Sequence, residues 1–222
     1  MKHCILGITG GVGCGKSTVL NILQKDHGAY IIQADLVAHQ LMEPGQASYC
    51  AIVEHFGKEI LSADGQIDRK ALGAIVFSDE EKLTLLNSLT HPAVKEEICR
   101  RIIEQFTQAL ECERADLMSD SNTNSDRSES TLFIVIEAAL LLEDHYDEIC
   151  DEIWCVCADR EVRFQRLADS RGYSREKSQS MMDNQMSDDE LRCRCQIMID
   201  NSGTLEETKR ALNAALQERG LL

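Results

Sequence analysis

Short, mostly apolar runs alternate with helical patterns along this chain. Runs of four to eight residues that are typical of buried strands occur at 3–9, 30–34, 131–136, 152–157 and 197–200. Between the first two runs, apolar side chains recur at helical spacing at Val19, Leu20, Ile22 and Leu23, and Gly28 ends that helix. Strands that alternate with helices predict an α/β fold: a five-stranded parallel sheet with helices on both faces.

The stretch 36–110 shows helical signals and no strand signal. Ser78 and Glu81 have the spacing of a capping box, and Pro92 stands where a long helix would begin. We therefore expect a helical insert between the second and third strands. Beyond the third strand, the pattern predicts a helix at 159–171 that Asp159 caps.

Two further helix starts follow the same rule. Ser187 and Glu190 form one candidate capping box, and Thr204 and Glu207 form another that opens a C-terminal helix.

Composition narrows the class of protein. The 222 residues are 43% hydrophobic, which is enough for a packed core. No apolar run approaches about 18 residues, so no membrane-spanning helix is expected. The apolar run at the start of the chain is too short, and too interrupted by glycine, to be a signal peptide. We therefore expect a cytoplasmic protein whose ten cysteines are reduced thiols.

The net charge of −15 argues against a nucleic-acid-binding protein, which needs a basic surface. The acid is unevenly spread. Residues 111–130 carry six acids and two bases among Ser, Asp and Asn, and we expect them to form a mobile acidic loop. Residues 137–152 carry seven acids and no Lys or Arg, so these two segments supply −4 and −7 and the rest of the chain supplies −4. The net charge is therefore still compatible with a small, locally positive pocket that binds an anionic ligand.

Such a pocket is indicated where the first strand meets the first helix. The residues there match G-x-x-x-x-G-K-[ST], the phosphate-binding P-loop: Gly10, Gly11, Val12, Gly13, Cys14, Gly15, Lys16 and Ser17. Glycines let successive backbone N–H groups point at phosphate oxygens, and the positive end of the helix adds to that field. Lys16 would contact the β- and γ-phosphates, and the Ser17 hydroxyl would bind Mg²⁺. Cys14, close to this helix N-terminus, is expected to have a lowered thiol pKa and to be sensitive to oxidation.

Asp35 is the second candidate. The second strand is expected to extend through Ala34 and to deliver Asp35 at its carboxyl end, where open α/β sheets bind ligands. A carboxylate there could accept the proton of an attacking hydroxyl. The alternative is that Asp35 caps a helix at 36–42. Position alone leaves both interpretations open.

With these residues and motifs, the chain resembles the dephospho-coenzyme A kinase family. The likeness extends over nearly the whole chain except 111–130, and it is carried by motifs in order: GITGGVGCGKST from Gly7 to Thr18, Ala34-Asp35, EPG at 43–45, FGKEIL at 56–61, D-G-x-I-D-R at 64–69, Ala71-Leu72, VFS at 76–78, His91-Pro92, LLLE at 140–143, NQMS at 184–187 and IDNSG at 199–203. Many families share the P-loop, whereas the combination is specific.

The resemblance implies a P-loop NTPase fold of three α/β/α layers, with a helical substrate-binding insert and a helical lid. The core would comprise 1–35, 131–158 and 196–222, the CoA-substrate domain 36–110, and the lid 159–195. The implied reaction, the last step of coenzyme A biosynthesis, moves the γ-phosphoryl group of ATP to the ribose 3′-hydroxyl of dephospho-CoA with Mg²⁺. It gives CoA and ADP.

The resemblance also implies residue roles. The nucleotide site would comprise Gly11 to Thr18, including Lys16, Ser17 and Thr18, with Asn201 at the adenine. Asp35 would be the base. Arg166 and Arg171 would be lid cations that stabilise the transferred phosphoryl group, the alternative being solvated charges on a helix. Thr9, Asp35, His39 and His91 would contact the acceptor, and for His91 a packing role at a helix start is an equal alternative. Nothing in the sequence indicates an oligomeric state.

Four positions depart from the family pattern. Gln33 replaces the first acid of D-A-D, His39 stands where an Arg is common, Ala139 replaces a Pro, and Ser170-Arg171-Gly172 shifts the Arg of R-D-G by one place. His lacks the paired donors with which Arg binds a phosphate. We therefore expect weaker binding of the substrate at position 39, or binding by a residue elsewhere in the chain.

Two alternatives are weighed against this function. One is another small-molecule or nucleotide kinase of the same fold. The other is a GTP-dependent switch or binding module, which is disfavoured because the guanine-reading motif N-K-x-D is absent. A purely structural protein is disfavoured because Lys16 and Asp35 would then have no use.

Overall fold

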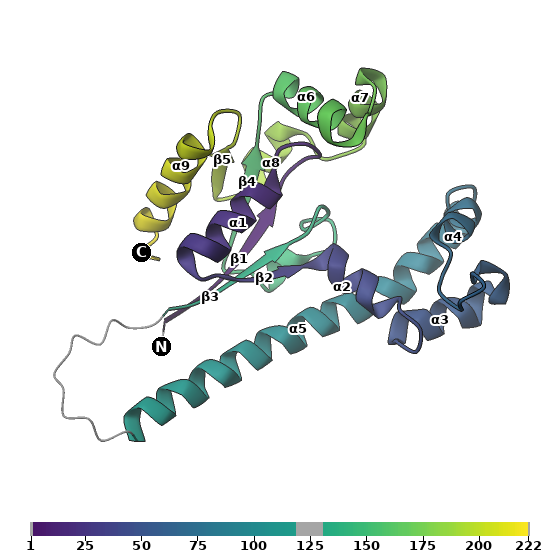
Figure 1. The fold of residues 1–222 in the computed structure, drawn as a ribbon, viewed down its shortest axis with the longest axis horizontal. Helices are drawn as coiled ribbons and strands as arrows, with labels where there is room; N and C mark the ends of the chain where they lie inside the picture. Colours follow the sequence, from purple (N-terminus) through teal and green to yellow (C-terminus); the bar gives the residue numbers. More distant parts are fainter. Residues whose placement is uncertain (1, 119–130, 222) are drawn as a thin grey trace. The chain divides into compact units, whose positions relative to one another are not determined.

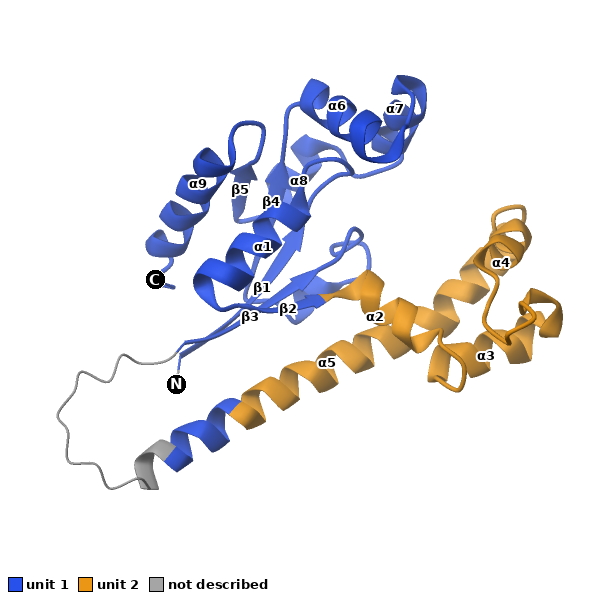
Figure 2. Cartoon of the chain, viewed as in Figure 1, with its two compact units in different colours: residues 1–32, 109–222 blue, residues 33–108 orange. Residues whose placement is uncertain are grey.

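A computed structural model describes residues 2–118 and 131–221, and in it the chain divides into two compact units. Unit 1 comprises the described residues up to Ile32 and from Ala109 onward, and unit 2 comprises Gln33–Gln108 (Figure 2). The P-loop therefore belongs to unit 1, and Asp35 belongs to unit 2.

Among the residues that the structure describes, unit 1 is built on a five-stranded sheet with β1 in the middle (Figure 1). The strands are β1 (Lys2–Thr9), β2 (Tyr30–Gln33), β3 (Thr131–Glu137), β4 (Glu152–Cys157) and β5 (Ile197–Asp200), in the order β2-β3-β1-β4-β5. β1 pairs in parallel with β3 and β4, and β4 pairs in parallel with β5. The α/β fold class is confirmed.

Helices α1 (Lys16–His27) and α9 (Leu205–Glu218) pack together on this sheet. Val19 and Leu23 of α1, Trp154 of β4 and Leu212 of α9 share one apolar core and are fully buried. Burial of this kind contributes about 25 cal/mol for each Å² of apolar surface removed from water. The core therefore anchors β1 and α1, the two elements that flank the P-loop.

Helices α6 (Arg160–Arg171), α7 (Arg175–Asp183) and α8 (Asp188–Arg194) lie between β4 and β5 in the chain. The capping boxes predicted at Ser187/Glu190 and Thr204/Glu207 are both present. Asp159 occupies the N-cap position of α6, but its side chain accepts no capping hydrogen bond from the described residues. A 3-10 turn, η2 (Tyr146–Glu148), precedes β4.

Unit 2 is helical, as the insert at 36–110 was expected to be. It contains α2 (Ala34–Leu41), α3 (Ala47–Phe56), the 3-10 turn η1 (Lys58–Ile60), α4 (Arg69–Val76) and most of α5 (Glu80–Met118). A separate core of Ile52, Phe56, Ile60, Leu72 and Val76 joins α3, η1 and α4.

Four local predictions are wrong, the last of them in the acidic segment. First, β2 ends at Gln33, so Ala34 and Asp35 belong to the first turn of α2. Gln33 is the N-cap, and Asp35 does not cap the helix. Ala34, Leu36 and Ala38 favour helix, and a carboxylate in a first turn interacts favourably with the helix dipole.

Second, Asp79 caps α5 in place of the predicted Ser78. Asp79 Oδ1 accepts hydrogen bonds from the backbone N–H groups of Glu81 and Lys82, at 3.1 and 3.2 Å. The Ser78 hydroxyl donates to the Ala74 carbonyl oxygen at 3.0 Å instead. A shift of one residue gives the stronger acceptor, a carboxylate, to the N-terminal N–H groups.

Third, Pro92 lies inside α5 and does not start it. An interior proline costs about 3 kcal/mol. Burial of Val94, Ile98 and Ile102 on the same helix offsets that cost.

The acidic segment 111–130 was expected to be a loop, but its first part is helix. α5 continues to Met118, because Glu, Arg, Ala, Leu and Met favour helix even in an acidic stretch. The expectation for residues 119–130 lies outside the described residues. Among the helices that the structure describes, none combines the length and apolar character needed to cross a bilayer.

Candidate functional site

The P-loop connects β1 to α1, as predicted. Gly15, the N-cap of α1, has φ +86°, a left-handed conformation that favours glycine. A Cβ atom there would lie 2.2 Å from the side-chain nitrogen of Asn201. Only glycine therefore permits both the turn and the close approach of Asn201.

Lys16 is held at the base of this loop. Its Nζ donates a hydrogen bond to the Gly10 carbonyl oxygen at 2.9 Å and lies 3.7 Å from Glu137 Oε1. Both side chains are largely buried, 16% and 9% exposed. The ammonium thus has two oxygen partners that incoming phosphate oxygens can replace.

Glu137 lies at the candidate site beside Lys16, and the sequence reasoning did not identify it. It is the last residue of β3 and pairs in register with Ile8 of β1, two residues before Gly10. An acid directly after the apolar run 131–136, at the carboxyl end of a central strand, was the available signal.

The donor set near the loop suits Mg²⁺. The Ser17 hydroxyl is exposed in the first turn of α1, and the Glu137 carboxylate contacts the neighbouring Lys16. Hydroxyl and carboxylate oxygens are hard ligands, and Mg²⁺ is usually bound by one or two of them together with substrate phosphates and water.

Cys14 has a different environment from the one expected. Its side chain is 1% exposed, and burial raises the pKa of its thiol, while the nearby charges of Lys16 and Arg163 lower it by less. The expectation of a lowered pKa is wrong because desolvation disfavours the thiolate more than the neighbouring cations favour it. All ten cysteines are free thiols.

We expect Cys14 to resist alkylation in the folded protein. At pH 8, iodoacetamide should modify it at least about tenfold more slowly than exposed Cys193, because burial shields the sulfur from the reagent and its raised pKa leaves less of the reactive thiolate. Mass spectrometry of peptides from a labelling time course measures both rates. Equal rates would contradict the buried, protonated thiol.

Asn201 and Arg166 support the second half of the P-loop. The Asn201 side-chain nitrogen donates to the Cys14 carbonyl oxygen at 2.8 Å, and its Oδ1 accepts from the Thr208 hydroxyl at 2.8 Å. Arg166 donates to the carbonyl oxygens of Cys14, at 3.2 Å, and Asn201, at 2.7 Å. Asn201 is 3% exposed, so this amide is committed to holding the loop.

The structure brings Arg166 to the P-loop but does not bring Arg171 there. Arg171 is exposed, and its guanidinium lies 5.9 Å from the centre of the Tyr173 ring. Arg163, which was not predicted, lies against the loop instead. Its Nε donates to the Val12 carbonyl oxygen at 2.9 Å.

The remaining residues predicted in this region occupy the loop and its flanks. Thr9 is buried at the end of β1, and the Thr18 N–H donates to the Gly15 carbonyl oxygen at 3.0 Å. The Val12 N–H donates to Gln185 Oε1 at 2.8 Å. In this conformation the Val12 N–H is therefore already hydrogen-bonded to the Gln185 side chain.

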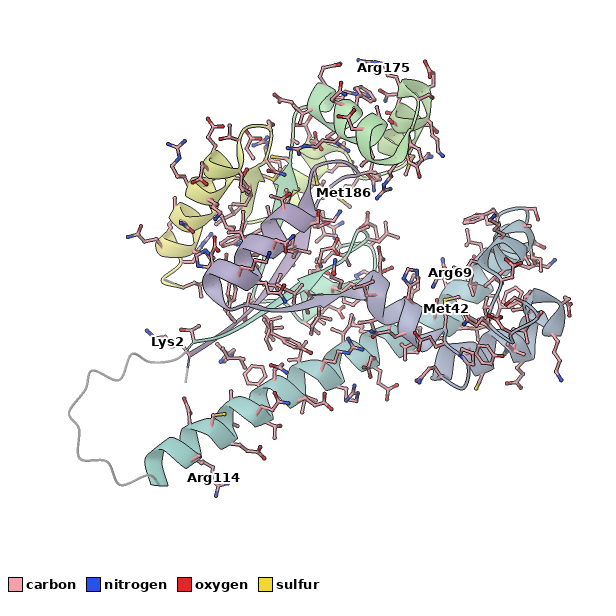
Figure 3. The ribbon with its side chains drawn as sticks, viewed as in Figure 1. Lys2, Met42, Arg69, Arg114, Arg175 and Met186 are labelled. Carbon is pink, nitrogen blue, oxygen red and sulfur yellow. The ribbon has the colours of Figure 1, made fainter. Side chains whose placement is uncertain are left out.

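Within unit 2, Asp35 and His39 lie four residues apart on α2 and are both exposed. An Nη1–H of Arg69, the first residue of α4, donates to His39 Nε2. A cavity of about 230 Å³ is lined by His39, Met42, Glu43, Pro44, Gln66, Ile67 and Arg69. Arg69 and Met42 are seen there in Figure 3. The structure thus supplies a guanidinium beside the position where the family pattern has an arginine.

His91 lies in the interior of α5 and is half-buried. Its place beside Pro92 is therefore in a continuous helix and not at a helix start.

Comparisons with known proteins point to one family, described as dephospho-CoA kinase. The family model described as dephospho-CoA kinase matches residues 4–126 and 117–207. The dephospho-CoA kinase of Carboxydothermus hydrogenoformans is 37% identical over 96% of this chain and 93% of its own. A crystal structure from Thermus thermophilus covers 98% of both chains with a TM-score of 0.72 and 28% identity. The Campylobacter jejuni dephospho-CoA kinase, 24% identical, covers 99% of this chain and 100% of its own with a TM-score of 0.65 and shares the fold.

Proposed function

Because the chain belongs to the dephospho-CoA kinase family, we propose that it transfers the γ-phosphoryl group of ATP to the ribose 3′-hydroxyl of dephospho-CoA. The observation that carries the proposal is the position of Lys16. Its ammonium is held between the Gly10 carbonyl oxygen and Glu137 at the start of a helix. Such a cation, with the N–H groups of the following turn, can neutralise charge on transferring phosphate oxygens.

On this proposal the nucleotide binds to unit 1. The backbone from Gly13 to Thr18 receives the phosphates, and Lys16 moves from its protein partners to the β- and γ-phosphate oxygens. Ser17 and Glu137 would hold Mg²⁺, directly or through water, and the ion would stabilise charge on the bridging phosphate oxygens. Arg166, beside Cys14 and Asn201, is the better placed of the two predicted lid cations.

The acceptor is assigned to unit 2. We propose Asp35 as the group that orients or deprotonates the attacking hydroxyl, since it is exposed and belongs to the motif that the family resemblance singles out. His39 and Arg69 would bind a negatively charged part of the acceptor, with Arg69 supplying the paired donors that His39 lacks.

We further propose that residues 159–195 form a lid that excludes water during transfer and so limits ATP hydrolysis. The proposal gives residues 111–130 no catalytic part. The protein would carry out this reaction in the cytoplasm.

Purified protein, ATP, Mg²⁺ and dephospho-CoA test the proposal. We expect CoA and ADP in equal amounts by liquid chromatography and mass spectrometry. An acceptor analogue without the ribose 3′-hydroxyl should give no phosphorylated product. Nucleoside monophosphates serve as the competing acceptors.

Two outcomes contradict the proposal. No CoA at saturating substrates would exclude the reaction. Faster transfer to a nucleoside monophosphate would favour another kinase of the same fold.

A further inference from the structure

Arg163 is buried although it carries a permanent charge. Its side chain is 8% exposed, on the face of α6 that also buries Phe164 and Leu167. Arginine is seldom buried without strong partners, because its charge loses hydration. The partners of Arg163 therefore indicate why a guanidinium is kept there.

Its closest hydrogen bond goes to the P-loop. Nε donates to the Val12 carbonyl oxygen at 2.9 Å, whereas Nη1 lies 3.5 Å from Asp188 Oδ1. The Asp188 side chain is 56% exposed, so water screens this longer ion pair. The shorter and better shielded interaction of the buried guanidinium is thus the one with the P-loop backbone.

Val12 is held from its other side as well. Its N–H donates to Gln185 Oε1 at 2.8 Å, in the segment that follows α7. Both polar groups of one P-loop residue are therefore fixed by side chains from outside the loop. Figure 1 shows α6 and α7 beyond the end of β1, on the side where the P-loop turns into α1.

Gly11 supplies an independent observation. A Cβ atom at Gly11 would lie 2.4 Å from Arg163 Nη2 and 3.0 Å from its Cζ. Gly11 is not among the glycines with positive φ in the described chain, so its backbone conformation does not demand glycine. A Cβ atom at this position would instead have to displace the Arg163 guanidinium from its place against the loop.

We propose that Arg163 is a positioning residue for phosphoryl transfer: acting through Val12 and Gly11, it fixes the first half of the P-loop in the shape that receives phosphate. It does not need to touch the nucleotide. Its effect is to remove alternative loop conformations before binding, so that the N–H groups require no rearrangement. The inference rests on the proposed function only for its kinetic readout, since nucleotide binding can be measured without an acceptor.

The first test compares Arg163→Met with Arg160→Met, one turn earlier on the same helix. Arg160 is exposed and contacts Asp183 and the Phe164 ring, not the P-loop. For Arg163→Met we expect ADP affinity, measured by titration calorimetry, to fall about tenfold and kcat to fall at least as much. The KM for the acceptor should stay within twofold, and Arg160→Met should change none of these.

The second test is a double-mutant cycle of Gly11→Ala with Arg163→Lys, in which the charge and the fold are kept but the planar group over Gly11 is removed. We expect Gly11→Ala to weaken ADP binding by about tenfold in the native background. In the Arg163→Lys background, where the smaller ammonium leaves room for a Cβ atom, the same change should weaken binding by less than about threefold, so that the two changes are not additive.

Each outcome decides the proposal. Unchanged ADP affinity in folded Arg163→Met, or additive effects in the cycle, would overturn it. If Arg163→Met does not fold, as thermal denaturation would show, the cycle alone decides. If the wild-type protein binds ADP but makes no CoA, the proposed function fails, and the calorimetric cycle still tests the role of Arg163.

Discussion

Replacing Lys16 by methionine should lower kcat by about 10²–10³-fold, the range found when one preorganised charge-stabilising donor is removed from an active site. Methionine is similar in length and carries no charge. Without the ammonium, the buried Glu137 carboxylate would lose the neighbouring positive charge that separates it from the incoming phosphates, and the affinity for ADP should fall as well. Single-turnover transfer at saturating ATP measures the chemical step.

Lys25→Met is the matched control, since Lys25 is exposed in the last turn of the same helix. It should leave rate and affinity unchanged. A Lys16→Met enzyme within fivefold of the native rate would remove Lys16 from the mechanism. Thermal denaturation of both variants separates loss of chemistry from loss of folded protein.

The second large effect is expected for Asp35→Asn. The amide has the shape of the carboxylate but cannot accept a proton, so kcat should fall about 100-fold or more, while ATP binding and the KM of the acceptor stay within about threefold. Steady-state kinetics with both substrates varied, together with ATP titration by calorimetry, gives all three values.

Glu54→Gln serves as the control, because Glu54 is an exposed acid on α3 of the same unit. A rate for Asp35→Asn within a few-fold of wild type would show that Asp35 is not the base. Hydroxyl activation would then have to come from another group.

Local sequence patterns predicted the parts of the site that depend on neighbouring residues. The P-loop, its strand and its helix span 26 consecutive residues, and the capping boxes of α8 and α9 each span four. Hydrophobic period, glycine spacing and N-cap chemistry operate over such distances. They were less able to place Asp35, because one residue more or less of strand changes which element carries it.

The supports of the P-loop could not be derived in the same way. Arg163, Gln185 and Asn201 meet the loop from 151, 173 and 187 residues along the chain. In the sequence, Arg163 is one charged residue in a helix rich in charges, and only its shared face with Phe164 and Leu167 sets it apart. Tertiary packing decides that this arginine is buried while Arg171 remains in solvent.

The position of β1 has a consequence for synthesis of the chain. β1 is made first, yet its partners in the sheet are β3 and β4, which begin at residues 131 and 152. Pairing over such separations forms slowly, because long loops must close first. The amide of Asn201, which closes the loop against Cys14, is synthesised 187 residues after Cys14 itself. The P-loop is therefore made long before the strands and the amide that hold it, and the nascent chain can complete its supports only after Asn201 has been added.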